Sequence, residues 1–586
     1  MTDKWFTTPR LRTVRPVRGR RTEAALLIEE GRAGTTGRIW PGGEGELLPF
    51  EVPLDAELTP DLRHVLMLDD DGGSEVGHLV ARPVDGGPAV DLTPDREPYV
   101  LRGLDVGAES VLITAVDEAG FHAVLIPAAR TVWSSPHEAW YARLSADGRT
   151  MCIDSTDHNP GVRRTAVTVV DVATGDTVAV LDDLPTGPVR ATRFSPEPGD
   201  TRLLVSTERS GYARPAVWNY ATGARTDLEP AGVEGELIPL DWHAATGRVL
   251  ALHVDEGRHR LLVLDERDGR ILDVVDEPGA YANPDVADVH DWQWASYFAP
   301  DGTLRVLRSR WDQPVQVVGL IDPAPVPPGV RLDSHMVTSA DGSKVQVWWA
   351  RPPGNKKCGT ILEIHGGPNL VHVDEYSPTA QAWLDAGFAY AAVNYRGSVT
   401  FGRAFREGFW RAGVEPELAD VRAALDFLRE QGVARPESTF VTGASYGGHM
   451  TLQCLGRLPD DFAGGFAHVA MADWASAFDE MNPAVRGVWM TWVGGDAEAI
   501  ARFSAITYVG QVRGSVWLNQ GSRDTRTPGT QIQRYADALA AAGGDVVLHW
   551  FDAGHEPTGL DRERADHETM LALTRRTEKR QSWEDS

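Results

Sequence analysis

The chain has 586 residues, several times the usual length of one domain, so more than one domain is expected. Its net charge of −27 repels phosphate backbones and makes nucleic-acid binding a poor hypothesis. The apolar fraction of 42% indicates a globular protein, and no run approaches the roughly 18 apolar residues of a membrane-spanning helix, so no membrane partner is expected.

The three cysteines, Cys152, Cys358 and Cys454, lie far apart, which excludes a disulfide framework and favours a reducing compartment. Residues 1–21 carry seven Lys or Arg but lack the apolar run of a signal peptide. We therefore expect a cytoplasmic protein in which residues 1–21 form an N-terminal extension.

Residues 22–321 contain short apolar segments separated by turns rich in Gly, Asp and Pro. One pattern recurs: an apolar residue, a small residue, Pro or Ala, often Asp-Gly, and then a strand. The strands after the turn are HVLML, TMCI, RLLVS, RVLAL and LRVLR, with weaker copies before AALLI and SVLITA. A spacing of roughly 35 to 55 residues is typical of four-stranded propeller blades, so these copies predict a seven-bladed β-propeller. A pair of β-sandwiches is the alternative, and the persistence of the period favours the propeller.

A Pro-rich linker occupies residues 322–329, and the pattern changes after it. Apolar strands such as TILEI, AYAAV and VWLNQ now alternate with amphipathic helices. This alternation predicts a parallel sheet covered on both faces, and hence an α/β domain over residues 330–586.

The first motif of this domain is His365-Gly366-Gly367-Pro368, directly after the strand ILEI. Gly-Gly-Pro is ordinary turn chemistry, but a glycine-rich turn at this place can also present backbone N–H groups to an oxyanion. Together with the next motif, the second role is favoured, and Gly367 is the candidate donor.

The second motif is Gly443-Ala444-Ser445-Tyr446-Gly447, between the strand FVT and an expected helix. A sharp strand-to-helix turn exposes such a serine, and the glycines avoid clashes with the neighbouring strand and helix. The pattern is weak alone, but it occurs once and at the expected junction. Ser445 is therefore the candidate nucleophile, and the N–H of Tyr446 is the second candidate oxyanion donor.

An acid and a histidine are expected after the serine. Asp524 follows the strand VWLNQ and His555 follows VVLHWF, at the ends of strands where sites form in such sheets. His555 would act as base and acid, and Asp524 would fix its tautomer. The whole pattern predicts an α/β-hydrolase domain that transfers acyl groups through an acyl-enzyme.

A propeller followed by HGGP, Asn394-Tyr395-Arg396-Gly397-Ser398, GASYGG, DTRTP and DAGH resembles the prolyl oligopeptidase family of serine peptidases, and within it the acylaminoacyl peptidases. The resemblance covers essentially the whole chain. It implies a peptidase of short or acylated peptides that uses Ser445, Asp524 and His555, with Gly367 and Tyr446 as the oxyanion hole and with the propeller screening access.

The resemblance also suggests residues that bind substrate. Arg526 matches an arginine that lies near the substrate in similar enzymes, although a structural or surface role is equally open. The apolar stretch 471–493 lies where the family builds its pocket for the residue before the scissile bond. The candidates are Trp474, Val485, Val488 and Trp489, for which plain core packing is the alternative.

Three positions depart from the family pattern. Gln520 stands where many relatives carry a histidine, and the HGGP turn continues as Asn369-Leu370. We expect neither departure to contact the triad. Dipeptidyl relatives anchor a free amino terminus with a pair of glutamates on a propeller helix, whereas Glu29-Glu30 ends a predicted strand, so a dipeptidyl peptidase is not favoured.

Several readings stay open. The first is an acylaminoacyl or oligopeptide hydrolase, or an aminopeptidase of the same family. The second is a pathway-specific relative that removes a leader peptide or passes its acyl group to an amine. The third is a catalytically inactive scaffold, against which the filled catalytic positions argue. No cofactor and no metal are expected, because no ligand cluster or phosphate-binding loop is present, and pairing of blade edges would allow a homo-oligomer.

Overall fold

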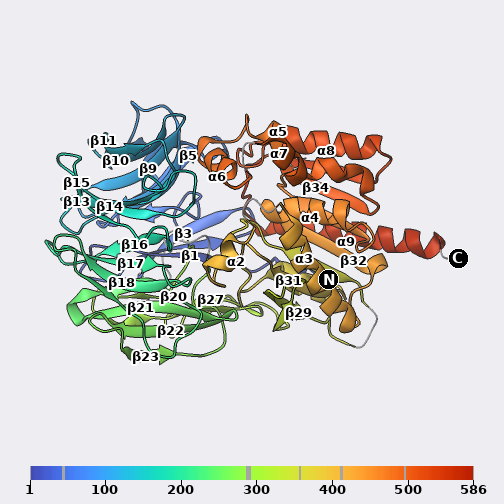
Figure 1. Cartoon of the computed structure of the whole chain (residues 1–586), viewed down its shortest axis with the longest axis horizontal. Coiled ribbons are helices and arrows are strands. Elements are labelled where there is room, and N and C mark those ends of the chain that lie inside the picture. The colour runs from blue at the N-terminus through green and yellow to red at the C-terminus, as the bar shows by residue number, and fades with distance from the viewer. Residues whose placement is uncertain are drawn as a thin grey trace.

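A computed structural model describes residues 2–41, 47–284, 292–354, 358–409, 413–493 and 496–584. It has two parts side by side (Figure 1): antiparallel sheets in the N-terminal half, coloured blue to green, and a sheet covered by helices in the C-terminal half, coloured yellow to red. Within the described residues, no helix is long and apolar enough to cross a membrane.

The N-terminal part is a propeller of antiparallel sheets. Strands β1–β3 form one sheet, β4–β11 form a joined eight-stranded sheet, three four-stranded sheets follow, and two two-stranded sheets complete it. The strands up to β11 are β1 (Arg10–Pro16), β2 (Ala25–Glu30), β3 (Thr35–Trp40), β4 (Glu57–Leu58), β5 (His64–Asp70), β6 (Val76–Pro83), β7 (Val90–Asp91), β8 (Tyr99–Val106), β9 (Val111–Asp117), β10 (Gly120–Ile126) and β11 (Arg130–Ser135).

Of the later sheets, the three four-stranded ones have the regular order first, second, third and fourth strand, and the last two are pairs of strands. Their strands are β12 (Ala139–Leu144), β13 (Thr150–Ser155), β14 (Ala166–Asp171), β15 (Thr177–Leu181), β16 (Val189–Phe194), β17 (Arg202–Thr207), β18 (Arg214–Asn219), β19 (Arg225–Asp227), β20 (Glu236–His243), β21 (Arg248–Asp255), β22 (Arg258–Asp265), β23 (Ile271–Val275), β24 (Tyr297–Phe298), β25 (Leu304–Arg305), β26 (Leu307–Arg310) and β27 (Gln313–Val317). The strands expected after the recurrent turn are β2, β5, β9, β13, β17, β21 and β25 with β26. In the regular sheets they are the second strand, whose side chains are buried because its two faces pack against the neighbouring sheets.

The structure corrects the predicted boundary at residue 22. Strand β1 pairs antiparallel with β2, and the N–H of Val14 donates to the carbonyl oxygen of Gln293 near the last strands, at 3.1 Å. Residues 10–16 thus belong to the propeller and not to an N-terminal extension. The strand was missed because Arg10 and Arg12 give it a basic pattern, and both pair with Glu30.

The C-terminal sheet has the order β28-β29-β31-β30-β32-β33-β34-β35. The prediction of a parallel sheet is confirmed from β31 to β35, whereas β28 and β29 pair antiparallel, as does β29 with β31. The strands are β28 (Asp333–Thr338), β29 (Lys344–Ala350), β30 (Thr360–Ile364), β31 (Ala389–Asn394), β32 (Thr439–Ala444), β33 (Gly464–His468), β34 (Ser515–Gly521) and β35 (Val546–Phe551).

Helices cover both faces of this sheet, because successive strand residues point to opposite faces. On one face α1 and α9 pack on side chains such as Ile361 and Phe440, and on the other α3, α4 and α8 pack on Leu362 and Val441. The α-helices are α1 (Pro378–Asp385), α2 (Arg403–Glu407), α3 (Glu415–Glu430), α4 (Tyr446–Arg457), α5 (Trp474–Ala477), α6 (Pro483–Val493), α7 (Ala497–Phe503), α8 (Gly529–Ala541) and α9 (Leu560–Glu584). Short 3-10 helices are η1 (Thr2–Trp5), η2 (Ala244–Thr246), η3 (Pro436–Ser438) and η4 (Ala505–Gln511).

The parallel strands determine where the sequence motifs meet. Ile364 at the end of β30 pairs with Gly443 of β32, and Gly521 of β34 pairs with Phe551 of β35. The loops that follow these four strands therefore emerge at one edge of the sheet, the usual place of a site in such folds.

Candidate active site

Ser445 lies in the turn between β32 and α4 in a backbone conformation that L-residues rarely adopt, with φ 58° and ψ −119°. The turn is tight, since a Cβ on Gly447 would lie 2.1 Å from the carbonyl oxygen of Ile364, and a Cβ on Gly443 would lie 2.5 Å from the same atom. Only glycine fits at both positions, which explains the motif. The Ser445 side chain itself is half-buried and accessible.

The glycine-rich turn after β30 packs directly against this serine. A Cβ on Gly366 would lie 3.5 Å from Cβ of Ser445, and Gly367 has a φ of +106° that favours glycine. Tyr446 is the first residue of α4, where a backbone N–H has no partner within the helix. The structure thus brings both predicted oxyanion residues to the vicinity of Ser445.

Asp524 and His555 follow the neighbouring parallel strands β34 and β35, which brings their loops together. Nδ1 of His555 lies 2.8 Å from Oδ2 of Asp524, and the two side chains are 4% and 0% exposed. This contact assigns the ring proton to Nδ1 in the neutral imidazole and leaves Nε2 as the basic atom. Within the described residues, no hydrogen bond joins Ser445 to His555, and such a bond often forms fully only with substrate bound.

The carboxylate of Asp524 receives further hydrogen bonds. Oγ1 of Thr527 donates to Oδ2 at 2.7 Å, and the backbone N–H groups of Arg526 and Thr527 donate to Oδ1 at 2.9 and 2.8 Å. Burial alone would raise the pKa of Asp524, but the charge and hydrogen bond of His555 and the Thr527 donors outweigh it and lower the pKa below its ordinary value. Asp524 is therefore a stable anion beside the imidazole.

The expectation that Gln520 does not contact the triad is wrong. Its Nε2 donates to Oδ2 of Asp524 at 3.2 Å and to the carbonyl oxygen of Thr527 at 2.9 Å. Gln520 lies in β34, four residues before Asp524, and the loop turns back so that the acid meets the strand that precedes it. Asn369 is also expected not to contact the triad. Its described hydrogen bond is with another loop, where its Nδ2 donates to the carbonyl oxygen of Gly397 at 2.7 Å.

Arg526 is held between two carboxylates. Its Nε lies 2.7 Å from Glu75 of the propeller, and its Nη1 lies 2.8 Å from Glu556, the residue after His555. Its pKa lies well above the ordinary value, because these charges outweigh its burial. The guanidinium thus joins the two parts of the molecule beside the site.

The four candidates for an apolar substrate pocket separate into two groups. Trp474 and Trp489 are 1% and 8% exposed and pack on each other with ring centroids 4.5 Å apart. Trp489 also lies parallel to Tyr446, at 5.4 Å. Val485 and Val488 are only partly buried at the edge of the same cluster. The tryptophans therefore support the residue after the serine, and the two valines are the more accessible of the four.

Sequence reasoning missed Thr527 and Glu417. Thr527 lies three residues after Asp524, a spacing at which a side chain can hydrogen-bond back to an aspartate, so its role was accessible from the sequence. Glu417, at the start of α3, accepts a hydrogen bond from the Tyr446 hydroxyl at 2.5 Å, and nothing in the sequence relates these two positions.

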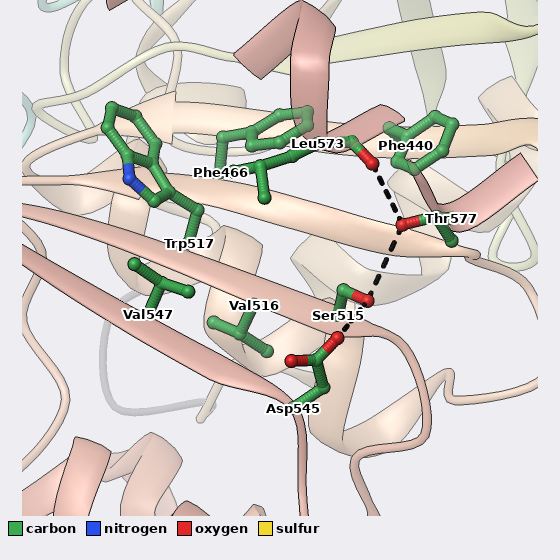
Figure 2. A pocket seen from close by; sticks show the side chains of 9 residues that line it. All are labelled: Phe440, Phe466, Ser515, Val516, Trp517, Asp545, Val547, Leu573 and Thr577. Carbon is green, nitrogen blue, oxygen red and sulfur yellow. Dashed lines mark hydrogen bonds between the residues drawn. The ribbon is translucent and has the colours of Figure 1, made fainter. Parts of the chain in front are cut away.

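A small pocket lies on the face of the sheet that α9 covers (Figure 2). Ser515 at its wall begins β34, and Phe440 lies near the start of β32, so the pocket is at the amino ends of the strands and apart from Ser445. In the parts of the chain that the structure describes, no group of three or more His, Cys, Asp or Glu is arranged to hold a metal ion.

Curated relatives that resemble the chain are peptidases. An acylamino-acid-releasing enzyme of Arabidopsis thaliana is 27% identical over 257 residues, which cover 40% of this chain and 32% of that enzyme. Dipeptidyl aminopeptidase BIII of Pseudoxanthomonas mexicana is 25% identical over 84% of this chain and 75% of its own length. The matched region thus spans about a third of the length of the acylamino-acid-releasing enzymes of Arabidopsis thaliana and Oryza sativa.

Solved structures share the two-part fold. A puromycin hydrolase superposes with a TM-score of 0.78 at 19% identity and covers 97% of this chain and 94% of its own. The acylaminoacyl peptidase of Pyrococcus horikoshii has a TM-score of 0.68 at 15% identity over 98% and 97% of the two chains. Residues 375–579, which contain Ser445, Asp524 and His555, match the sequence model of the prolyl oligopeptidase family.

Proposed function

We propose that the chain is a serine peptidase in which Ser445 is the nucleophile, His555 the general base and acid, and Asp524 the residue that orients His555. The observation that carries the proposal is the buried Asp524–His555 pair, 2.8 Å apart, at the same sheet edge as a strained serine turn. The match of residues 375–579 to the sequence model of the prolyl oligopeptidase family supports it.

The reaction follows from this geometry. His555 removes the proton from Ser445 as Oγ attacks the peptide carbonyl, and Asp524 stabilises the imidazolium. The N–H groups of Gly367 and Tyr446 stabilise the oxyanion, each by roughly 3–4 kcal/mol. His555 then protonates the leaving amine as the C–N bond breaks, and water hydrolyses the acyl-enzyme by the same steps in reverse order.

The proposed substrates are short peptides from which an acylated or free N-terminal residue is released. Acylamino-acid-releasing enzymes among the relatives support the acylated class. Dipeptidyl aminopeptidase BIII, which matches most of the chain, favours a free amino terminus as the second candidate. Glu30 of the Glu29-Glu30 pair binds Arg10 and Arg12, so this glutamate is occupied by the propeller itself. Removal of a leader peptide, or acyl transfer to an amine, would use the same acyl-enzyme.

We also infer that the sheets of the propeller form seven blades, with β4–β7 and β8–β11 as two of them and β24–β27 as the last. Arg526, Val485 and Val488 remain the proposed contacts of the substrate. A cytoplasmic location, which the small number and wide spacing of the cysteines favour, and self-association through strand edges also stay proposals.

The experiment compares the wild-type protein with Ser445→Ala on p-nitroanilides of Ala, Leu, Phe and Pro, each with a free or an acetylated amino end. Acetylated substrates cleaved only by the wild type would establish the acylaminoacyl activity. A preference for free amino ends would assign an aminopeptidase, and a preference for Pro would assign the prolyl branch. Equal turnover by both proteins would refute the proposed nucleophile.

A further inference from the structure

A buried carboxyl lies behind the candidate oxyanion hole. Glu417, in the first turn of α3, is 0% exposed, and its Oε1 accepts a hydrogen bond from the hydroxyl of Tyr446 at 2.5 Å. Tyr446 is itself 1% exposed and follows Ser445 directly. The steps derived above use the backbone of Tyr446 but neither its phenol nor Glu417.

We propose that Glu417 is a positioning residue that fixes Tyr446, and thereby the backbone N–H next to Ser445, through the phenol hydroxyl. This inference rests on the proposed function, because it concerns the oxyanion hole of that reaction.

The contacts of the Tyr446 ring show why its far end needs a partner. Trp489 lies parallel to the ring at 5.4 Å with an angle of 10°, and Tyr395 lies at 6.5 Å with an angle of 18°. His449 and Phe409 contact the ring at tilted angles, at 5.1 and 6.4 Å, but none of these ring contacts provides a partner for the buried hydroxyl. The hydrogen bond to Glu417 provides that partner and anchors the hydroxyl end of the ring. Because the ring and the N–H belong to one residue, a shift of the ring moves the N–H.

The surroundings of Glu417 favour its neutral form. Its Oε2 has no hydrogen-bond partner among the described residues. Asp420, one turn later on α3, already pairs with Arg396 at 2.7 Å, and Glu415 pairs with Arg457 at 2.8 Å, so both nearby cations are engaged. An anion here would be buried with two described donors, the Tyr446 phenol and the backbone N–H of Glu417 itself.

The acid–base behaviour agrees with this geometry. Burial raises the pKa of Glu417 to about 8, with Asp420 and Glu415 adding to the rise and the Tyr446 hydrogen bond opposing it. Tyr395 and Tyr446 have their own pKa values raised by burial and by the nearby Glu417, so they remain neutral donors. Above about pH 8 the carboxyl would ionise beside Asp420, and the packing behind Tyr446 would be disturbed.

The test uses three full-length variants. Glu417→Gln keeps an acceptor for the phenol but cannot ionise, and Glu417→Leu removes the acceptor. Asp426→Asn is the control, since this residue lies further along α3 with its side chain 60% exposed. For each protein, kcat and KM on the preferred p-nitroanilide and the rate of Ser445 labelling by a fluorophosphonate are measured from acid to alkaline pH, and folding is checked by thermal unfolding.

The wild type and Asp426→Asn should lose kcat above about pH 8, whereas Glu417→Gln should keep its neutral-pH kcat within about twofold and retain it at higher pH. Glu417→Leu should lose about tenfold in kcat with little change in KM, as expected for a transition-state interaction. An alkaline fall in Glu417→Gln with the wild-type midpoint would overturn the inference, and this comparison decides even if Glu417→Leu does not fold. If the wild type is labelled at Ser445 but its kcat depends on pH in the same way as that of Glu417→Gln, the inference about Glu417 is wrong and the proposed function is unaffected. A wild type that is neither labelled nor active defeats the proposed function and the inference with it.

Discussion

At the scale of single residues, the site is organised around the carboxylate of Asp524. His555, Thr527 and Gln520 each direct a polar side-chain atom at its Oδ2, and two backbone N–H groups bind the other oxygen. A carboxylate bound by so many donors stays ionised and keeps one orientation, which the partner of a catalytic histidine requires.

Replacing Asp524 by Asn should lower kcat by about 10³–10⁴-fold while the protein remains folded, because an amide can hold the wrong tautomer of His555. Steady-state kinetics and circular dichroism measure the two effects. Asp552→Asn is the matched control, since Asp552 lies three residues before His555 with its side chain 81% exposed, and it should leave kcat unchanged. Similar losses in both variants would mean that Asp524 has no special role.

Replacing Gln520 by Leu should lower kcat roughly tenfold with little change in KM, because one hydrogen bond to a charged group, worth about 1.5 kcal/mol, is lost. Gln533→Leu, on the exposed side of α8, provides the comparison, and kinetics on one p-nitroanilide suffice. An unchanged kcat in Gln520→Leu would show that Thr527 and the backbone hold Asp524 without it.

The pKa of Glu417 also predicts a pH dependence of stability. The folded pKa of about 8 lies above the ordinary 4.5, so between these values the folded chain keeps a proton that the unfolded chain has lost. Stability from this group is fully present below pH 4.5 and is lost as the pH rises to about 8, by at most about 5 kcal/mol. In urea unfolding, the free energy of unfolding of Glu417→Gln should increase relative to that of the wild type from about pH 5 to pH 8. A constant difference between the two proteins would contradict the raised pKa.

At the scale of elements, the connection from β32 to α4 is the most constrained part of the site. Gly447→Ala places a Cβ 2.1 Å from one backbone oxygen and 2.8 Å from another, atoms that a rotamer change cannot move. We expect a loss of stability and of activity, seen as a lower melting temperature and as slower labelling of Ser445.

The control for this substitution is Gly487→Ala in the exposed part of α6. Nothing lies within 4 Å of a Cβ there, and alanine favours a helix over glycine by about 1 kcal/mol, so this variant should be as stable as the wild type or more stable. Equal effects of the two substitutions would mean that the turn is less tight than its distances indicate.

Several elements could be predicted from the sequence because their signals are local. A turn of Asp and Gly before an apolar run marks β13 and β17, and a strand followed by GxSxG marks β32 and α4. Strand β1 could not be recognised, because its arginines find their acidic partners in β2 and in α9. For the same reason the Glu417–Tyr446 contact is invisible in the sequence, since it depends on how α3 packs against α4.

At the scale of the whole molecule, the propeller touches the catalytic loops directly. The loop between β5 and β6 reaches the segment around the triad: the hydroxyl of Thr525 donates to the carbonyl oxygen of Ser74 at 2.8 Å, and Arg526 binds Glu75. A Cβ on Gly73 would lie 2.9 Å from the backbone nitrogen of Gly554, next to His555. These contacts join segments more than four hundred residues apart, so they cannot be predicted from a local sequence pattern.

A second contact between the two parts is a buried ion pair near α2. Nη1 and Nη2 of Arg406 lie 2.7 and 2.6 Å from the two carboxylate oxygens of Glu208 in the propeller, and both side chains are at most 10% exposed. Glu236 accepts the N–H of Gly402 at 3.0 Å beside them. Paired and bidentate charges of this kind tolerate burial, whereas a single one does not.

Arg406→Ala should destabilise the protein by about 3–5 kcal/mol, because it leaves Glu208 buried without its cation. Thermal unfolding and nicking by a protease at the junction of the two parts measure the effect. Arg513→Ala removes an ion pair with Asp460 whose side chains are 68% and 75% exposed, and it should change little. A melting temperature unaffected by Arg406→Ala would show that the two parts are held together elsewhere.

The central claim is that Ser445 is an activated nucleophile, and active-site labelling tests it most directly. Wild-type protein and Ser445→Ala are treated with a fluorophosphonate, digested, and the modified peptide is identified by mass spectrometry. One adduct, on Ser445, should form in the wild type, should form more slowly by orders of magnitude in Asp524→Asn, and should be absent in Ser445→Ala. An adduct on another residue, or no adduct on folded wild-type protein, would contradict this claim.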